Sequence, residues 1–315
     1  MGIKVRTHSF VTICLALSLK VMAEGGPSHP VSAGALGSTE TTRIQRLSTF
    51  RLAPNGNILA CDAKAEVVKV ISPSDELVAT WTLPFAPSAV HALDEDTIFV
   101  GGSGRVARLD KTGKVVKELD LASIELPKAR VPCVTASDKD LFVAVRIRTG
   151  FAVYRFDHQL QQPRKIIEGL RGCCGQMDIH AANGKLYVAE NARFSVKTYD
   201  ADGKQLASWG KPAREGKEWF SGCCNPKNIC IGPDGMVYTA DSPSGIVKRF
   251  TLEGKYLGLV GTAEVGAGCV HAAVFVSADG RRVYVCDTTK NVIRVLETPP
   301  AAQFSAPVGE TKGKG

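Results

Sequence analysis

The feature that most constrains the fold of this chain is a sixfold internal repeat. Each unit holds a turn signal followed at once by a short apolar strand, and the units recur at intervals of roughly 40 to 50 residues, the range typical of propeller blades. The six strands after these turns are Ile58–Ala60, Ile98–Val100, Leu141–Val143, Leu186–Val188, Val237–Thr239 and Val283–Val285. The repeat therefore predicts a radial, repetitive architecture.

Within each unit the pattern predicts four short strands. The fourth unit shows them most clearly, at Met177–Ala181, Leu186–Ala189, Ser195–Tyr199 and Gln205–Trp209. A four-stranded sheet cannot bury both of its faces alone, so packing against two neighbouring sheets must supply the core. We expect an all-β protein, a six-bladed β-propeller of four-stranded antiparallel blades over residues 41–297, without any sizeable helix.

The strand count also predicts how the ring closes. The sixth unit offers three strands after Cys269, the last at Ile293–Leu296, and lacks an outer strand. The N-terminal segment Thr41–Leu47 precedes the first inner strand and has no partner in its own unit. We expect Thr41–Leu47 to complete the last blade and remove the open sheet edge.

The sequence predicts that both ends of the chain lie outside the propeller. Residues 1–23 combine Lys4 and Arg6, a short apolar run and a small-residue cleavage site at Val21–Ala23, which together indicate a signal peptide. That apolar run is about half the ~20 residues a membrane-spanning helix needs. Residues 24–40 predict a flexible lead and residues 298–315 a disordered tail. The expected location is periplasmic or secreted, with no membrane span.

The net charge and its distribution along the sequence do not identify a binding partner. Loss of the signal peptide removes three bases and no acid, so the formal net charge falls from +8 to +5. Lysine and arginine are scattered among the acids, and nucleic-acid binding usually needs a basic stripe with aromatic platforms. We expect no nucleic-acid partner, and a monomer that meets an unknown protein or small molecule at its channel face.

Units four to six resemble the NHL-repeat family most clearly. Gly210–Phe220, Pro226–Ile229 and Asp234–Asp241 are similar to its pattern of a glycine-spaced approach, an aromatic, a proline, an inner strand, a D-G turn and a V-Y-V-A-D strand. The resemblance covers all six units and implies a six-bladed propeller of an exported type with doubled-cysteine insertions. Such a fold hosts many activities, so it implies little about function.

The strongest chemical signal is a doubled cysteine that recurs in register. Cys173-Cys174 opens the fourth unit and Cys223-Cys224 the fifth, each directly after a glycine, and Cys269 stands opposite Cys224 in the sixth. These residues lie where one blade crosses to the inner strand of the next, at the rim of the channel. His271, two residues after Cys269, is a further candidate ligand.

Three interpretations of these cysteines stay open. Thiolates of Cys173, Cys174, Cys223, Cys224 and Cys269, with His271, would hold copper, zinc or an iron–sulfur cluster for electron transfer, sensing or metal handling. Alternatively, each adjacent pair forms a vicinal disulfide on a scaffold that binds a protein or small ligand, a strained ring because neighbouring Cα atoms are only ~3.8 Å apart. Thirdly, they are packing residues.

The remaining polar candidates favour structural roles. Cys61 and Cys286 stand where sibling units carry alanine, which predicts buried packing residues. Cys133 lies inside an inner strand, and His91 and His180 share one register of these strands. NHL-like propellers include metal-dependent lyases and lactonases, but the candidates here are too sparse for us to predict catalytic residues.

Overall fold

The computed structural model describes residues 33–213, 218–222 and 224–298. The predicted signal peptide, the start of the expected lead, Cys223 and the tail from residue 299 lie outside these ranges. No helix within them is long and apolar enough to cross a membrane.

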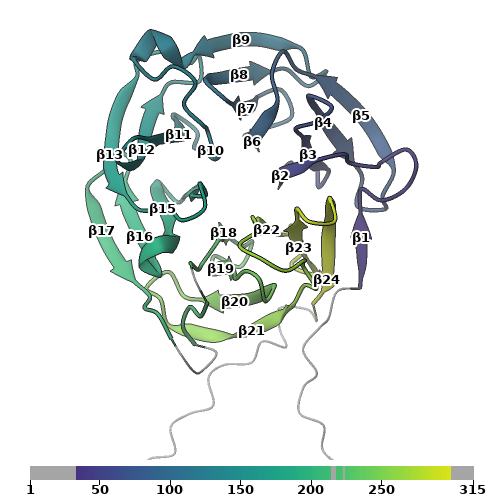
Figure 1. Cartoon of the computed structure of the whole chain (residues 1–315), viewed down its shortest axis with the longest axis vertical. Coiled ribbons are helices and arrows are strands. Elements are labelled where there is room, and N and C mark those ends of the chain that lie inside the picture. The colour runs from purple at the N-terminus through teal and green to yellow at the C-terminus, as the bar shows by residue number, and fades with distance from the viewer. Residues whose placement is uncertain (1–32, 214–217, 223, 299–315) are drawn as a thin grey trace, which may run out of the picture.

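The chain forms six four-stranded antiparallel sheets arranged as a ring, so the predicted six-bladed β-propeller is confirmed (Figure 1). Blade one holds β2 (Leu47–Leu52), β3 (Ile58–Asp62), β4 (Val67–Ile71) and β5 (Leu77–Thr82), and blade two holds β6 (Pro87–Ala92), β7 (Ile98–Gly102), β8 (Arg105–Leu109) and β9 (Val115–Asp120). Blade three holds β10 (Cys133–Ala136), β11 (Leu141–Ile147), β12 (Gly150–Phe156) and β13 (Arg164–Leu170), and blade four holds β14 (Asp178–Ala182), β15 (Lys185–Glu190), β16 (Ser195–Asp200) and β17 (Gln205–Trp209). Blade five holds β18 (Asn228–Ile231), β19 (Val237–Ala240), β20 (Ile246–Phe250) and β21 (Tyr256–Thr262), and blade six holds β22 (Val274–Val276), β23 (Arg282–Asp287), β24 (Val292–Glu297) and β1 (Gly34–Leu36).

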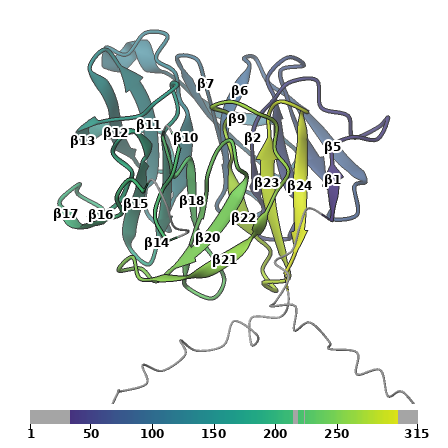
Figure 2. The ribbon, with the colours of Figure 1, turned by 60° about the horizontal axis from the view of Figure 1, so that its bottom comes forward.

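The only helical pieces among the described residues are two short 3₁₀ turns, η1 (Leu121–Ile124) and η2 (Asn191–Arg193). In each blade the first strand lies toward the centre of the ring and the last lies at its rim, as the two views show (Figures 1 and 2).

An N-terminal strand does close the ring, but the predicted segment was wrong. β1 (Gly34–Leu36) pairs antiparallel with β24, with Leu36 opposite Ile293. Thr41–Leu47 is instead mostly the connection from blade six to blade one, and only its last residue belongs to β2. This connection is held by Asp62, which accepts hydrogen bonds from the backbone N–H groups of Gln45 (2.7 Å) and Arg46 (3.0 Å), so its polar groups are satisfied without strand pairing.

The blades bury their faces against one another through middle strands that are almost wholly buried. Trp81, at the end of β5, packs against the tight turn of blade two, where a Cβ on Gly113 would lie 2.0 Å from its ring. Trp209 packs in the same way on Gly254 of blade five. Aromatic side chains of one blade thus need glycine turns on the next, which fixes how the blades stack.

Candidate functional site

The cysteines singled out by their register lie on the three connections that lead into β14, β18 and β22. These strands are the innermost ones of blades four, five and six, so the connections lie at one end of the central channel. The first connection turns sharply, with Cys174 and Gly175 both in the left-handed backbone region, at φ 56° and 70°. Cys173 is held by its backbone N–H, which donates to Asn191 Oδ1 at 2.7 Å.

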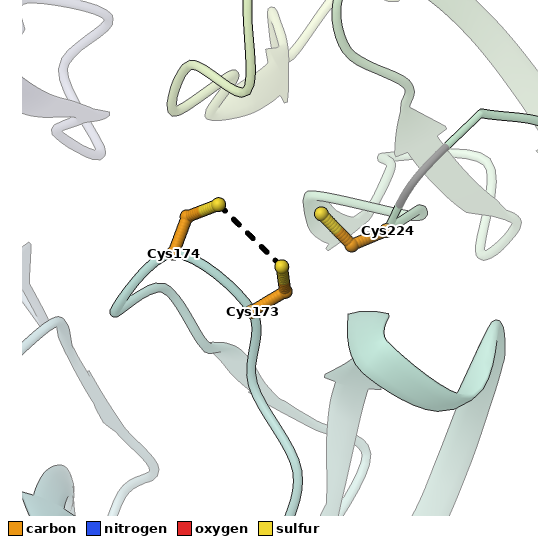
Figure 3. A group of neighbouring side chains, drawn as sticks. All are labelled: Cys173, Cys174 and Cys224. Carbon is orange, nitrogen blue, oxygen red and sulfur yellow. Dashed lines mark hydrogen bonds between the residues drawn. The ribbon is translucent and has the colours of Figure 1, made fainter.

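The structure brings four of the five predicted sulfurs together. The ligand atoms of Cys173, Cys174 and Cys224 all lie within 4.8 Å of one another, and their side chains point toward one another (Figure 3). The Cys173 and Cys174 sulfurs are 3.4 Å apart, and the Cys224 and Cys269 sulfurs are 3.9 Å apart. Cysteines from the connections into three different blades therefore form one thiol cluster, which we define as Cys173, Cys174, Cys224 and Cys269.

The Cys174 thiol resists ionisation because of its contacts with the neighbouring thiols. Hydrogen bonding with Cys173 raises the pKa of the Cys174 thiol to about 12, with further contributions from burial, from a hydrogen bond with Cys269, and from the charges of Cys173 and Cys224. Crowded thiols behave in this way because ionising one makes the next negative charge harder to accept. A bound cation would remove that penalty and displace the protons.

Lys227 supplies a positive charge beneath the cluster. Its side chain is fully buried, and its Nζ donates to the Cys224 sulfur at 2.9 Å. Burial acts to lower the pKa of the Lys227 ammonium, but the hydrogen bond to Cys224 and the nearby charges of Cys224, Cys269 and Cys174 raise it overall. A buried ammonium beside sulfur stabilises the thiolate form of that sulfur.

Two further residues were predicted for this site, Cys223 and His271. Cys223 lies outside the described residues. The His271 ring makes its hydrogen bond with the Thr49 hydroxyl of blade one, Nε2 to Oγ1 at 3.1 Å, rather than with a sulfur. Burial lowers the pKa of His271 to about 4, with Asp178 opposing and Lys227 adding to that effect, so the ring is neutral near pH 7.

Arg51 occupies the channel on the inner-strand register that also carries His91 and His180. The guanidinium of Arg51 donates to Val134 O of blade three at 3.1 Å and to Val90 O of blade two at 3.4 Å, and it lies 3.3 Å from His180 Nδ1 of blade four. Burial and then the Arg51 charge lower the pKa of His180 to about 3. This fixed positive charge disfavours a second cation among the channel histidines.

The other cysteines have structural environments. Cys61 and Cys286 are fully buried in the core, as predicted. Cys133 is buried too, but it does more than pack, because its thiol lies 3.0 Å from Asp178 Oδ1 and donates to that carboxylate.

Sequence reasoning missed Lys227, although a signal for it was present. Lys227 stands where blade four carries Met177, which is fully buried. A lysine at a position that a sibling repeat fills with a buried methionine, three residues after a doubled cysteine, predicts a buried charge with a nearby partner.

Comparisons with known proteins identify the architecture. No family model matches the chain. A stretch of 112 residues is 30% identical to the adipocyte plasma membrane-associated protein of Salmo salar; it covers 34% of this chain and only 25% of the relative. The chain thus matches about a quarter of the relative's length.

Three solved structures share the propeller ring. Regucalcin, a calcium-binding protein from Agrobacterium tumefaciens, superposes with a TM-score of 0.62 at 14% identity over 85% of this chain and 94% of that one. Hydrazine synthase from Kuenenia stuttgartiensis gives 0.58 at 14% identity over 85% and 100%, and virginiamycin B lyase from Staphylococcus aureus gives 0.55 at 15% over 80% of each chain. At these identities the likeness shows the six-bladed fold alone, and the NHL-repeat resemblance stays a prediction.

Proposed function

We propose that this chain is an exported propeller of the NHL-like type that binds one soft metal ion, Zn²⁺ or Cu⁺, through the thiol cluster at its channel mouth. Its role would be metal handling, sensing or electron transfer in the periplasm or outside the cell. The observation that carries the proposal is the convergence of the Cys173, Cys174 and Cys224 sulfurs to within 4.8 Å, with Cys269 beside Cys224.

The spacing of the sulfurs fits a single ion. A Zn–S bond of about 2.3 Å makes the edge of a tetrahedron about 3.8 Å long. The Cys173–Cys174 and Cys224–Cys269 sulfur distances, 3.4 and 3.9 Å, bracket that value, and the Cys224 sulfur lies within 4.8 Å of those of Cys173 and Cys174. An iron–sulfur cluster distributes its cysteine sulfurs over two or more iron atoms and so needs a wider set. The compact arrangement favours one ion.

The surroundings also suit bound thiolates. Four thiolates around Zn²⁺ carry a net charge of −2, and around Cu⁺ they carry −3. The buried Lys227 ammonium, 2.9 Å from the Cys224 sulfur, offsets part of that charge. Soft thiolate ligands select copper(I) and zinc over hard cations such as calcium.

Metal titration of the mature chain tests the proposal. Reduced, metal-free protein is titrated with Zn²⁺ against a competing chelator, and separately with Cu⁺ under nitrogen, and X-ray absorption then reports the ligand atoms. We expect one ion per chain with a sulfur-only coordination shell. Cys173→Ser and Cys224→Ser should each weaken binding by about 100-fold or more. Unchanged affinity in Cys224→Ser would refute the site.

The matched control is Cys61→Ala. Sibling blades carry Ala189 and Ala240 at the equivalent position, so the substitution is compatible with the fold, and Cys61 is buried away from the thiol cluster. Its metal affinity should equal that of the wild type.

A ligand-binding scaffold with vicinal disulfides is the second candidate function. It is favoured by the 3.4 Å distance between the adjacent Cys173 and Cys174 sulfurs in a chain with an export signal. Peptide mapping by mass spectrometry after alkylation without reduction separates the two functions. A mass showing Cys173 and Cys174 unalkylated in metal-free protein supports the disulfide, and alkylation of both supports the metal site.

A further inference from the structure

A second feature of the channel mouth is a cavity of about 510 Å³ beside the thiol cluster. Its wall comes from the connections of blades one to four and from His271 and Thr288 of blade six, and none of the described cysteines lines it. That volume lies in the range of small-molecule sites, about 300–1,000 Å³. The mouth thus holds the thiols toward blades four to six and this cavity toward the opposite side.

The charged groups of the cavity wall are cationic. Arg46 and Arg130 line the cavity, and no aspartate or glutamate among the described residues does. The ring of His271 also lines the cavity. The hydroxyls of Ser48 and Ser88 line the wall between these groups. The cavity therefore presents hydrogen-bond donors and positive charge.

Two guanidinium groups meet at the thiol-bearing turn without a carboxylate between them. A Cβ placed on Gly175 would lie 3.2 Å from Arg130 Nη1 and 3.0 Å from Arg146 Nη1. The ion pairs within the described ranges include neither of these arginines, nor Arg46. Like charges this close repel unless an anion lies nearby.

We propose that the mouth cavity binds a small organic anion, whose carboxylate or phosphate group is held by Arg46 and Arg130. The planar guanidinium pairs with both groups through two parallel hydrogen bonds. Arg146 adds positive charge from behind Gly175, and the serine hydroxyls face the remainder of the ligand. This site goes beyond the proposed metal site and does not depend on it, because none of its lining residues in the described part of the chain is a cysteine.

Calorimetry with metal-free, thiol-reduced mature protein tests the proposal at constant ionic strength. The probes are succinate, its neutral analogue succinamide, 3-phosphoglycerate and inorganic phosphate. We expect saturable binding of succinate or 3-phosphoglycerate with a Kd of about 1 mM or tighter, and none of succinamide. Whichever of the two binds distinguishes a carboxylate from a phosphate ligand.

The Arg46→Gln/Arg130→Gln double variant should weaken that binding by about tenfold or more. The control is Arg281→Gln/Arg282→Gln, which removes two charges from a separate cavity, and it should bind like the wild type. The proposal is overturned if neither organic anion binds below about 10 mM, if the Arg46→Gln/Arg130→Gln variant binds unchanged, or if phosphate binds as tightly as both. Because no metal is present, these outcomes leave the metal titration a separate question.

Discussion

Replacing Arg51 with methionine should destabilise the whole ring, because this one side chain joins four other blades. Besides its contacts with Val90, Val134 and His180, the Arg51 guanidinium lies 4.5 Å from the ring centroid of Phe275 in blade six. Arg51 is 5% exposed, so these contacts form in a desolvated environment. Methionine keeps the aliphatic stem and removes only the charged group.

The expected loss in the free energy of unfolding follows from the contacts that the substitution removes. Hydrogen bonds to a charged donor contribute about 1.5–3 kcal/mol each, and a desolvated cation–π contact about 2 kcal/mol. Arg51 also reaches the Cys133 sulfur, which donates to the buried Asp178 carboxylate, so its loss removes a positive charge near a carboxylate that keeps its hydrogen bond from the Ile229 N–H at 2.8 Å. The folded methionine variant avoids the free-energy cost of burying the charged guanidinium, and this offsets part of the loss. The two hydrogen bonds to carbonyls and the cation–π contact together contribute about 5–8 kcal/mol, and after the desolvation offset we expect a net loss of about 3–5 kcal/mol.

The assay is urea unfolding at pH 7.5 followed by tryptophan fluorescence, with Arg43→Met as the matched control. Arg43 is exposed and precedes β2 outside the channel, so its variant should stay within about 0.5 kcal/mol of the wild type. A loss below about 1 kcal/mol in Arg51→Met, or an equal loss in Arg43→Met, would refute the reasoning.

Three further predictions follow from the fold. The pKa values of His180 and His271 are lowered to about 3 and about 4, so below pH 6.5 the unfolded chain binds more protons than the folded chain. The free energy of unfolding should therefore fall as the pH drops from 6.5 toward 4, by up to about 1.4 kcal/mol per pH unit for each ring. Urea midpoints measured at pH 7.5 and pH 5 test this. Gly113→Ala should cost about 2–4 kcal/mol of stability, because it combines a left-handed backbone with a clash against the tryptophan of blade one. Gly56→Ala, at φ +84° with nothing near its Cβ, should show the backbone cost alone, about 1 kcal/mol. Thermal melts compare the two variants, and equal losses would contradict the packing argument. Deleting the N-terminal residues up to and including β1 exposes the edge of β24, so the melting temperature should fall and aggregation, measured by light scattering, should increase. Unchanged melting and aggregation would show that ring closure does not depend on this strand.

The repeat predicted most of the architecture because each blade solves the same packing problem with the same pattern. The strand at Leu186–Ala189 was predicted from its turn and its apolar run, and β15 (Lys185–Glu190) contains it. The acidic residues that end such strands have a structural use: Asp287, for example, accepts hydrogen bonds from the backbone N–H groups of Thr289 and Lys290 in the following turn. Local sequence is sufficient where local structure repeats.

Closure could not be located in this way. β1 (Gly34–Leu36) is three residues long and lies in a stretch of glycine, serine and alanine, a composition that indicates a flexible segment. Its strand conformation comes from pairing with β24, which is remote in sequence. Thr41–Leu47 carries the stronger strand signal but is required to span the gap between two blades. Only the assembled ring distinguishes the two.

The thiol cluster could be predicted in part. Register alone placed the sulfurs of blades four, five and six on equivalent connections, and the structure brings Cys173, Cys174, Cys224 and Cys269 together. The direction of His271 toward Thr49 could not be predicted, because it depends on how blade six meets blade one across the closure. The approach of Arg130 and Arg146 to the thiol-bearing turn likewise depends on the packing of blade three against blade four.

Arg51 also explains why ligands at the two ends of the channel should act independently. The cavity at the thiol end is lined by Leu47 and Ser48, which precede Arg51 on β2, and a second hollow of about 830 Å³ is lined by Leu52, which follows it. Between them the guanidinium spans the channel and contacts blades two, three, four and six. A small anion or a metal ion at the thiol end therefore approaches from that face alone. Its affinity should respond to substitutions on the connections that carry the cysteines and arginines, and not to those on the turns of the opposite face.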